Sequence, residues 1–185
     1  TKYVQKCVVE QSQEMADKIT LTVLNPQEDL LGGGYTGFFA FTDTKVFQPG
    51  NTILVYMGYG LEDRLVGAGI IQRFMPRFPQ DGAATLTIVA YDGSILFMDS
   101  EASEDGETWE DTPHSDVVLS IVNRAAILGT VEPTTTEKQV IKKRGMSDWE
   151  LIQGLARLHS YDAKVRWNED LDAWVDTLTA GREAH

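Results

Sequence analysis

A short stretch near residue 150 fixes the start of one helix. Ser147 precedes Glu150 by three positions. This is the capping-box spacing, in which the Ser hydroxyl accepts the N–H of Glu150 and the Glu carboxylate accepts the N–H of Ser147. The pattern predicts an amphipathic helix from Ser147 to about His159, packed on a small core. Its apolar stripe consists of Leu151, Ile152, Leu155, Ala156 and Leu158.

The first 98 residues have the pattern of an antiparallel β-structure. Residues 18–24 alternate, with Ile19, Leu21 and Val23 on one face and threonines on the other. Turn signals separate the runs, and no helical period interrupts them, so we expect a sandwich or barrel. The predicted strands are residues 3–10, 18–24, 52–57, 65–71 and 84–91. Glycines in the fourth run predict a bulge or a tight corner.

The second half of the chain predicts a different organisation. Residues 99–114 are crowded with Asp and Glu beside Gly, Ser and Pro, which favours an exposed acidic loop or linker. The spacing of these carboxylates is not that of an EF-hand calcium loop. Residues 115–178 predict a small α/β subdomain, and residues 179–185 a frayed tail. The predicted elements of the subdomain are a helix from Ser115 through Leu128 that ends at Gly129, a strand at 138–142, the capped helix, and strands at 163–167 and 171–175. The expected fold class is α+β, mainly β.

A long insertion, residues 25–51, joins the second and third predicted strands. It holds three consecutive glycines, residues 32–34, and then four aromatic residues: Tyr35, Phe38, Phe39 and Phe41. Loops of this length in compact domains are usually functional or disordered, and the aromatic content argues against disorder. Two interpretations stay open. The aromatic residues cover one end of the barrel core, or residues 30–41 form an arm that binds a neighbouring subunit through aromatic anchors.

The formal net charge of −12 argues against sequence-specific nucleic-acid binding. Phosphate neutralisation needs clustered Lys and Arg, and the densest basic cluster, residues 142–144, is short. An acidic channel wall would still let DNA slide past, because it repels the backbone. No apolar run reaches the ~18 residues of a membrane helix, and residues 1–24 lack the pattern of a secretory signal. The single cysteine, Cys7, cannot form an intrachain disulfide and is expected to be buried in a strand.

The sequence predicts no catalytic residues, no metal site and no cofactor. The three histidines, His114, His159 and His185, are not at metal-ligand spacing, and no zinc, phosphate-loop or serine-hydrolase motif occurs. His159 lies near the end of the second helix, where a cation is favoured by the helix dipole. An acidic cell-wall-degrading enzyme or a carbohydrate-binding module stays the alternative, since carboxylates abound and Trp109 lies in the acidic segment.

Four segments together resemble the hub proteins of bacteriophage tails, of the late-control-D type, and the related spike proteins of type VI secretion systems. They are residues 16–23, residues 46–60, residues 78–92 and Ser147-Asp148-Trp149-Glu150. The resemblance covers most of the chain. It implies a tail-tube-like β-barrel followed by an inserted α/β part.

The resemblance also implies a structural role without catalysis. Family members form a ring, with a trimer favoured, that joins the tail tube or distal tail proteins to the spike. The ring surrounds a channel through which DNA passes only as cargo. The implied location is the virion tail or baseplate, assembled in the bacterial cytoplasm. No second barrel follows residue 178, which leaves open whether the chain is a fragment or a separate protein supplies that barrel.

Overall fold

The computed structural model describes residues 2–12, 15–28, 38–42, 46–59, 62–98 and 106–180. The chain divides into two compact units, Thr1–Asp92 and Gly93–His185. The boundary lies before the predicted one at residue 98. The short helix α1 (Ile95–Met98) explains the difference, because its Phe97 is buried in the core of the second unit.

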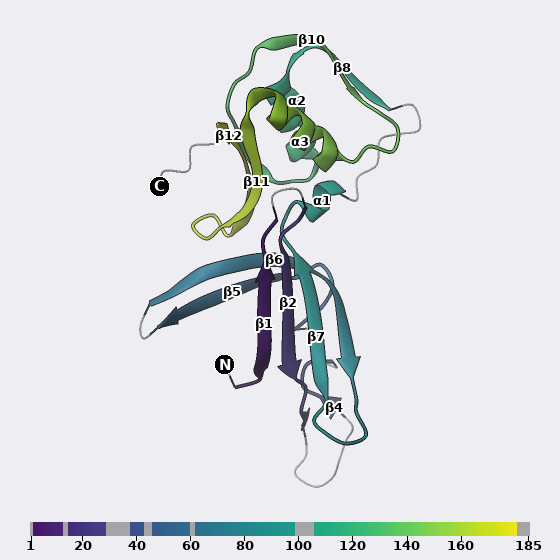
Figure 1. Ribbon diagram of the computed structural model, residues 1–185, viewed down its shortest axis with the longest axis vertical. Helices are drawn as coiled ribbons and strands as arrows, with labels where there is room; N and C mark the ends of the chain where they lie inside the picture. The colour runs from purple at the N-terminus through teal and green to yellow at the C-terminus, as the bar shows by residue number, and fades with distance from the viewer. Residues whose placement is uncertain are drawn as a thin grey trace. The chain divides into compact units, whose positions relative to one another are not determined.

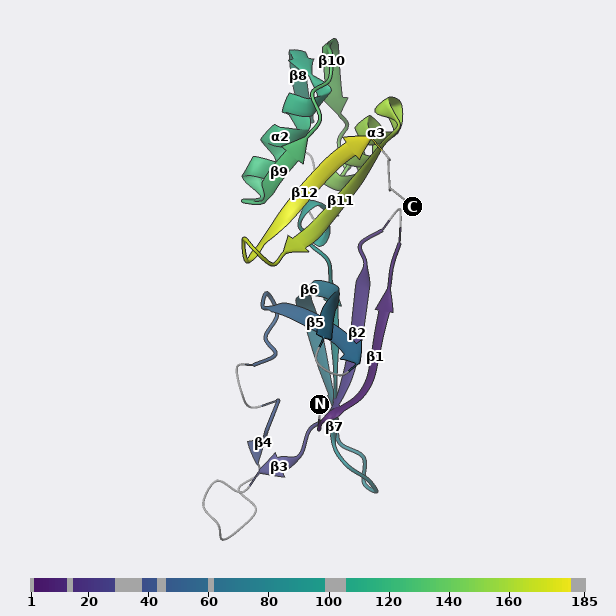
Figure 2. The same ribbon diagram turned by 90° about the vertical axis from the view of Figure 1, so that its left-hand side faces the viewer.

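The first unit is a curled antiparallel sheet of five strands (Figures 1 and 2). Its strands, in spatial order, are β1 (Val4–Glu10), β2 (Lys18–Leu24), β7 (Thr85–Tyr91), β6 (Glu62–Arg77) and β5 (Thr52–Tyr59). The sheet is a half-barrel, because its two edge strands, β1 and β5, are not paired with each other. The expected mainly-β, α+β fold is confirmed, with a barrel that does not close within one chain.

The alternation of residues sets the core of the first unit. Ile19, Leu21 and Val23 of β2 are buried together with alternate residues of β7, from Leu86 to Ala90. Burial of one face is what fixes the register of a strand, since a slip by one residue would expose the whole apolar set. The predicted bulge near the glycines of β6 is present, because the β5–β6 register shifts between Val55 and Tyr56.

One buried side chain anchors the long insertion. Asn25 is fully buried and donates from Nδ2 to Thr42 Oγ1 at 2.6 Å, while its Oδ1 accepts the N–H of Phe41 at 2.9 Å. The insertion also contains a short antiparallel pair, β3 (Gln27–Glu28) with β4 (Phe38–Phe39). These contacts hold the described parts of the insertion against the first unit.

The second unit combines two helices with two small sheets. A ribbon pairs β8 (Glu107–Pro113) with β10 (Thr136–Lys142), and a three-stranded sheet has the order β11 (Tyr161–Asn168), β12 (Ala173–Ala180), β9 (Leu128–Val131). The β12–β9 pair is parallel. Helices α2 (His114–Arg124) and α3 (Asp148–His159) bury their apolar faces in one core with Ala163 and Val165 of β11.

Three details of the second unit differ from the predicted elements. The acidic segment is a strand from Glu107 onward, because it pairs with β10 and Trp109 packs against the core. Helix α2 ends at Arg124, since Ala126 has a left-handed backbone with φ of 55°, and Gly129 lies in β9. Ser115 does not cap α2; its N–H donates to Thr134 Oγ1 at 2.9 Å.

Helix α3 begins where the spacing predicts. Ser147 is its N-cap, its Oγ accepts the N–H of Glu150 at 3.2 Å, and its own N–H donates to Glu150 Oε2 at 2.8 Å. Ser160 ends the helix in a left-handed conformation. The backbone N–H groups of Ser147 and Glu150 therefore each have a side-chain acceptor. These hydrogen bonds stabilise α3, whose Trp149 and Ile152 lie in the core.

Replacing the cap should weaken this unit. We expect Ser147→Ala to lower the free energy of unfolding by about 1 kcal/mol, because the Glu150 N–H loses its acceptor. Ser147→Asp keeps an acceptor and should stay near the wild-type value. Urea denaturation followed by circular dichroism measures both. Equal stability of the alanine and aspartate variants would show that the cap contributes nothing.

Two glycines of the second unit should respond oppositely to an added methyl group. A Cβ on Gly93 would collide with Val165 Cγ1 and lie 2.8 Å from Trp174 Cε3, whereas a Cβ on Gly154 in α3 meets nothing within 4 Å. Gly93→Ala should therefore lower the free energy of unfolding by about 1–3 kcal/mol, because the added methyl group overpacks the core. Gly154→Ala should raise the free energy of unfolding by about 0.5–1 kcal/mol, because Ala is the better helix former. Thermal unfolding of both variants provides the test, and a stabilised Gly93→Ala protein would contradict the packing.

Candidate functional site

The predicted aromatic arm lies only partly within the described residues. Tyr35 is outside them, and Phe38 is placed by its backbone pairing with Glu28. Phe39 is half-buried, and its ring lies 4.6 Å from that of Phe78, which is 53% exposed. The Phe39–Phe78 pair therefore forms an apolar spot where the β3–β4 pair meets the end of β6.

Phe41 has a different environment from Phe39. Its ring makes edge contacts with Tyr3 and Phe47, at centroid distances of 5.4 and 5.7 Å, and packs against the core cluster of the first unit. For this residue the structure favours the interpretation that the aromatic side chain covers one end of the core. An interface role for the arm accordingly concerns the residues before position 40.

The β5–β6 ribbon is a second exposed apolar feature. Residues 70–77 of β6 pair with β7, but residues 62–65 pair only with β5 among the described strands. The two strands extend together beyond the rest of the sheet (Figure 1). On this ribbon Tyr56, Met57 and Val66 are 46%, 49% and 36% exposed. A two-stranded ribbon is only marginally stable by itself in water, so this part of the sheet is less well supported than the five-stranded part.

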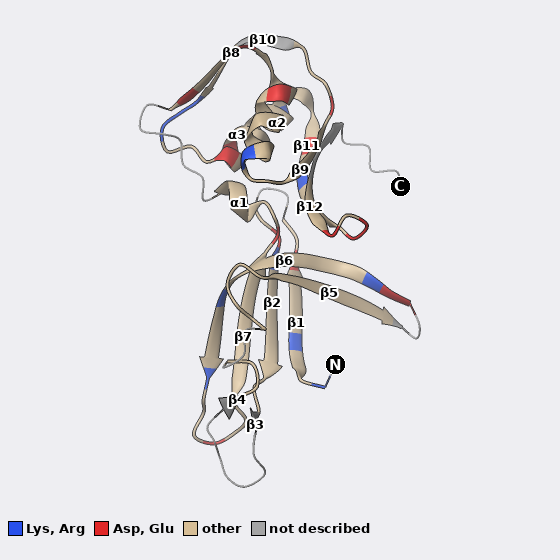
Figure 3. Cartoon of the chain, turned by 180° about the vertical axis from the view of Figure 1, so that it is seen from behind, with Lys and Arg blue, Asp and Glu red and all other residues tan. Residues whose placement is uncertain are grey.

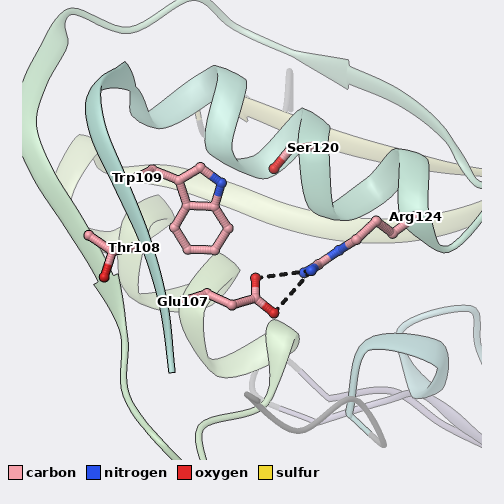
Figure 4. Close-up of a pocket in the computed structure, with 5 residues that line it drawn as sticks. All are labelled: Glu107, Thr108, Trp109, Ser120 and Arg124. Carbon is pink, nitrogen blue, oxygen red and sulfur yellow. Dashed lines mark hydrogen bonds and ion pairs between the residues drawn. The ribbon is translucent and has the colours of Figure 1, made fainter. Parts of the chain in front are cut away.

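The second unit contains a pocket between β8 and α2 (Figure 4). Its volume is about 430 Å³, and it is lined by Glu107, Thr108, Trp109, Ser120 and Arg124. In Figure 4 the indole of Trp109 lies between Thr108 and Ser120, and the Glu107–Arg124 ion pair closes one side. The pocket could hold a small polar ligand against an aromatic face. The Glu107 carboxylate and the Arg124 guanidinium that line the pocket already form an ion pair with each other.

A charge network links β8, α2, β10 and α3. Arg124 Nη1 lies 3.0 Å from both oxygens of Glu107, and its Nη2 lies 3.2 Å from Asp148 Oδ1. The same Oδ1 accepts from Lys142 Nζ at 2.8 Å, although the Lys142 side chain is only 1% exposed. The hydrogen bond with Glu107 is the main cause that raises the pKa of Arg124, assisted by the charges of Asp148 and Glu107. The network holds a buried cation in place.

His114 and His159 meet at the far ends of the two helices. His114 Nδ1 lies 2.7 Å from His159 Nε2, and the two rings are edge-on with centroids 5.0 Å apart. One of these two nitrogens donates its hydrogen and the other accepts it, so a single hydrogen bond joins the rings. The His159 ring also lies at a tilt against Tyr161, with centroids 5.5 Å apart. The bond between the histidines ties the start of α2 to the end of α3.

The described residues contain no group of three or more His, Cys, Asp or Glu side chains placed to hold a metal ion. Cys7 is half-buried, and burial raises the pKa of its thiol, which disfavours the reactive thiolate. None of the helices in the described part of the chain is both long and apolar enough to cross a membrane.

A family model for the Alg8 N-terminal domain matches residues 13–168. The match includes all the strands of the half-barrel except the first, and both helices α2 and α3. The chain belongs to the Alg8 N-terminal domain family. No curated protein matches the chain.

Three solved structures share the fold of this family member. The 43 kDa tail protein of prophage MuSo2 from Shewanella oneidensis is 13% identical, with a TM-score of 0.58, and the match covers 95% of this chain and 48% of that one. A tail protein from Neisseria meningitidis MC58 is 14% identical, with a TM-score of 0.56 and coverages of 91% and 44%. The E. coli c3393 protein is 10% identical, with a TM-score of 0.62 and coverages of 94% and 46%.

The E. coli c3393 protein is a component of the type VI secretion system with structural similarity to the T4 bacteriophage tail proteins gp27 and gp5. The predicted likeness to phage tail and type VI secretion proteins is therefore confirmed at the level of the fold. The chain spans about half the length of the structures that it matches. The hub assignment stays a prediction.

Sequence reasoning missed several of these features. Lys142 lies in a run that looks solvated, and only the pairing of β10 with β8 buries it beside Asp148. His114 and His159 are 45 positions apart, and no sequence spacing indicates their contact. The exposed β5–β6 ribbon does have a signal in the sequence. Residues 52–59 of β5 are uncharged, and charged residues follow at the tip of β6.

The buried Lys142–Asp148 pair gives a prediction. Asp148→Leu leaves the Lys142 ammonium buried without its closest carboxylate, and should lower the free energy of unfolding by about 3–5 kcal/mol. The double variant Lys142→Met/Asp148→Leu removes both charges and should recover a large part of that loss. Urea denaturation of the wild type, Asp148→Leu, Lys142→Met and the double variant measures the coupling energy between the two side chains. A double variant as unstable as Asp148→Leu would contradict the assigned role of the pair.

Proposed function

We propose that the chain is a structural hub component of a phage tail or a related contractile injection machine. The observation that carries this proposal is the fold, which three tail or type VI secretion proteins share over 91–95% of the chain. In the proposed role several copies form a ring that joins the tail tube to the spike and lines a central channel. A trimer is the favoured ring, as the resemblance to late-control-D hubs implies.

The surfaces of the first unit support an assembly role. Its sheet is an open half-barrel, with the β5–β6 ribbon exposing Tyr56 and Met57. Apolar groups of this kind are normally covered by a partner. The formal net charge of −12 suits a channel wall, because acidic side chains repel DNA and let it pass.

The proposed partners follow from this role. They are further copies of the chain, tail tube or distal tail proteins, and a spike protein, with DNA only as passing cargo. The proposed location is the virion tail or baseplate after assembly in the bacterial cytoplasm. The aromatic arm, residues 30–41, is the proposed contact with the adjoining ring through Tyr35, Phe38 and Phe39.

An enzyme of cell-wall breakdown is the alternative, and one observation favours it. The pocket beside Trp109 offers an aromatic face, two hydroxyls and a carboxylate, as sugar sites often do. The carboxylate of Glu107 is, however, bound by both oxygens to Arg124, which lowers its value as a general acid or base. We therefore propose that the chain is not an enzyme.

Arm variants test the proposed role. We expect Phe38→Ser/Phe39→Ser to reduce the binding of this chain to tail tube or distal tail proteins several-fold in co-sedimentation, with little change in the melting temperature. Phe41→Ser is the matched control, because that ring packs on the core, and it should destabilise the fold by about 2–4 kcal/mol. If the double variant unfolds, both rings belong to the core, and the proposed interface role of the arm is wrong. Clearing of peptidoglycan by the wild-type protein would favour the enzymatic alternative.

A further inference from the structure

The pocket between β8 and α2 is built by the periodicity of its two walls. Glu107 and Trp109 are two positions apart on β8, so their side chains lie on the same face of the strand. Ser120 and Arg124 are four positions apart on α2 and lie one turn apart on one face of the helix. The two faces meet across the pocket (Figure 4). The fold therefore brings an aromatic ring, a hydroxyl group and an ion pair to one place.

The indole of Trp109 gives the pocket an apolar wall and a hydrogen-bond donor. Part of this side chain packs against the core of the second unit, and part of it lines the pocket. Figure 4 shows the indole nitrogen on the side of the ring that faces α2. Within the described part of the chain, no acceptor is hydrogen-bonded to this N–H. Because a buried indole N–H usually has a partner, a ligand with an acceptor would complement it.

Ser120 and Glu107 supply acceptors to the same pocket. The Ser120 hydroxyl donates to the carbonyl oxygen of Val117 at 2.7 Å, so the lone pairs of its oxygen can accept from a ligand. Both carboxylate oxygens of Glu107 lie 3.0 Å from Arg124 Nη1, which fixes the carboxylate in one orientation. Each carboxylate oxygen has a second lone pair for a ligand hydroxyl. The pocket therefore suits a ligand with several hydroxyl groups.

The charges beside the pocket cancel. The network that borders it consists of two cations and two carboxylates: Arg124, Lys142, Glu107 and Asp148. Figure 3 shows acidic residues of β8 beside the basic end of β10, where Lys142 is the register partner of Glu107. A charged ligand would lose hydration on entry and would find no unbalanced opposite charge in return. The pocket accordingly favours a neutral ligand.

We propose that this pocket binds a neutral saccharide without cleaving it. The sugar hydroxyls donate to Glu107 and Ser120 and accept from Trp109 Nε1, while the C–H face of the sugar ring packs on the indole. The volume of about 430 Å³ lies within the ~300–1,000 Å³ of ligand pockets. The described lining contains one carboxylate, whereas glycoside cleavage by the common mechanism needs two. This site is separate from the ring of the proposed function.

Isothermal titration calorimetry with three neutral sugars provides the first test. The probes are cellobiose, mannobiose and N,N′-diacetylchitobiose, and we expect at least one to bind the wild-type chain and to be recovered intact. Ser120→Leu fills the pocket with a larger apolar side chain and should weaken this binding about tenfold or more. Asn123→Leu is the matched control, because Asn123 is exposed on α2 and does not line the pocket. Both variants should melt close to the wild-type temperature.

Two further variants test the assigned contacts. Trp109→Phe keeps an aromatic ring against the core but removes the indole N–H, so it should weaken sugar binding several-fold. Glu107→Gln leaves the Arg124 charge less well balanced, so it should shift the preference of the pocket from the neutral sugars toward glucuronic acid. Because a residue with a purely structural role would not change this preference, the shift reports direct contact with the ligand.

Four outcomes would overturn the inference. They are no binding of any of the three neutral sugars, equal weakening by Ser120→Leu and Asn123→Leu, wild-type binding of glucuronic acid or glucosamine as tight as that of the neutral sugars, and cleavage of a bound sugar. The first three would leave the proposed assembly role intact, since that role depends on the fold. Cleavage that is lost in Glu107→Gln would contradict both proposals.

Discussion

The sheet of the first unit has one apolar face to bury and too few strands to close around it. Five antiparallel strands curl until Ile19, Leu21 and Ile88 are covered, but β1 and β5 stay apart as two edges. The half-buried side chains Cys7, Val9, Ile53 and Val55 lie toward these edges, where the curl is incomplete. A sheet of this kind leaves some of its apolar side chains only half-buried, and we propose that a neighbouring subunit covers them. The assembly role proposed for the chain depends on that property.

The second unit is organised around a buried cation. The Lys142 ammonium is buried away from water and is paired with the carboxylate of Asp148. Asp148 is also the first residue of α3. Arg124 extends the network from α2 to Glu107 on β8. The ion pairs therefore orient both helices and the β8–β10 ribbon around one carboxylate. The same bonds occupy the groups of the pocket that a hydrolase would need.

The sequence could predict the elements whose signals are local. The strand at residues 18–24 has the predicted bounds because alternation and Asn25-Pro26 define it, and the cap of α3 depends on two residues three positions apart. The strand β8 was missed because its pairing with β10, which buries Trp109, outweighs its acidic composition. The end of α2 was missed because a left-handed Ala126, rather than Gly129, ends it. Contacts such as His114–His159 depend on tertiary packing, and no local pattern encodes them.

We propose that copies of this chain assemble into a ring around a channel. Electron microscopy of the purified protein, at concentrations where it sediments as an oligomer, would reveal such a ring. We expect ring-shaped class averages with a central hole and cyclic symmetry. Particles no larger than one chain at every concentration, or compact two-fold dimers without a hole, would contradict it.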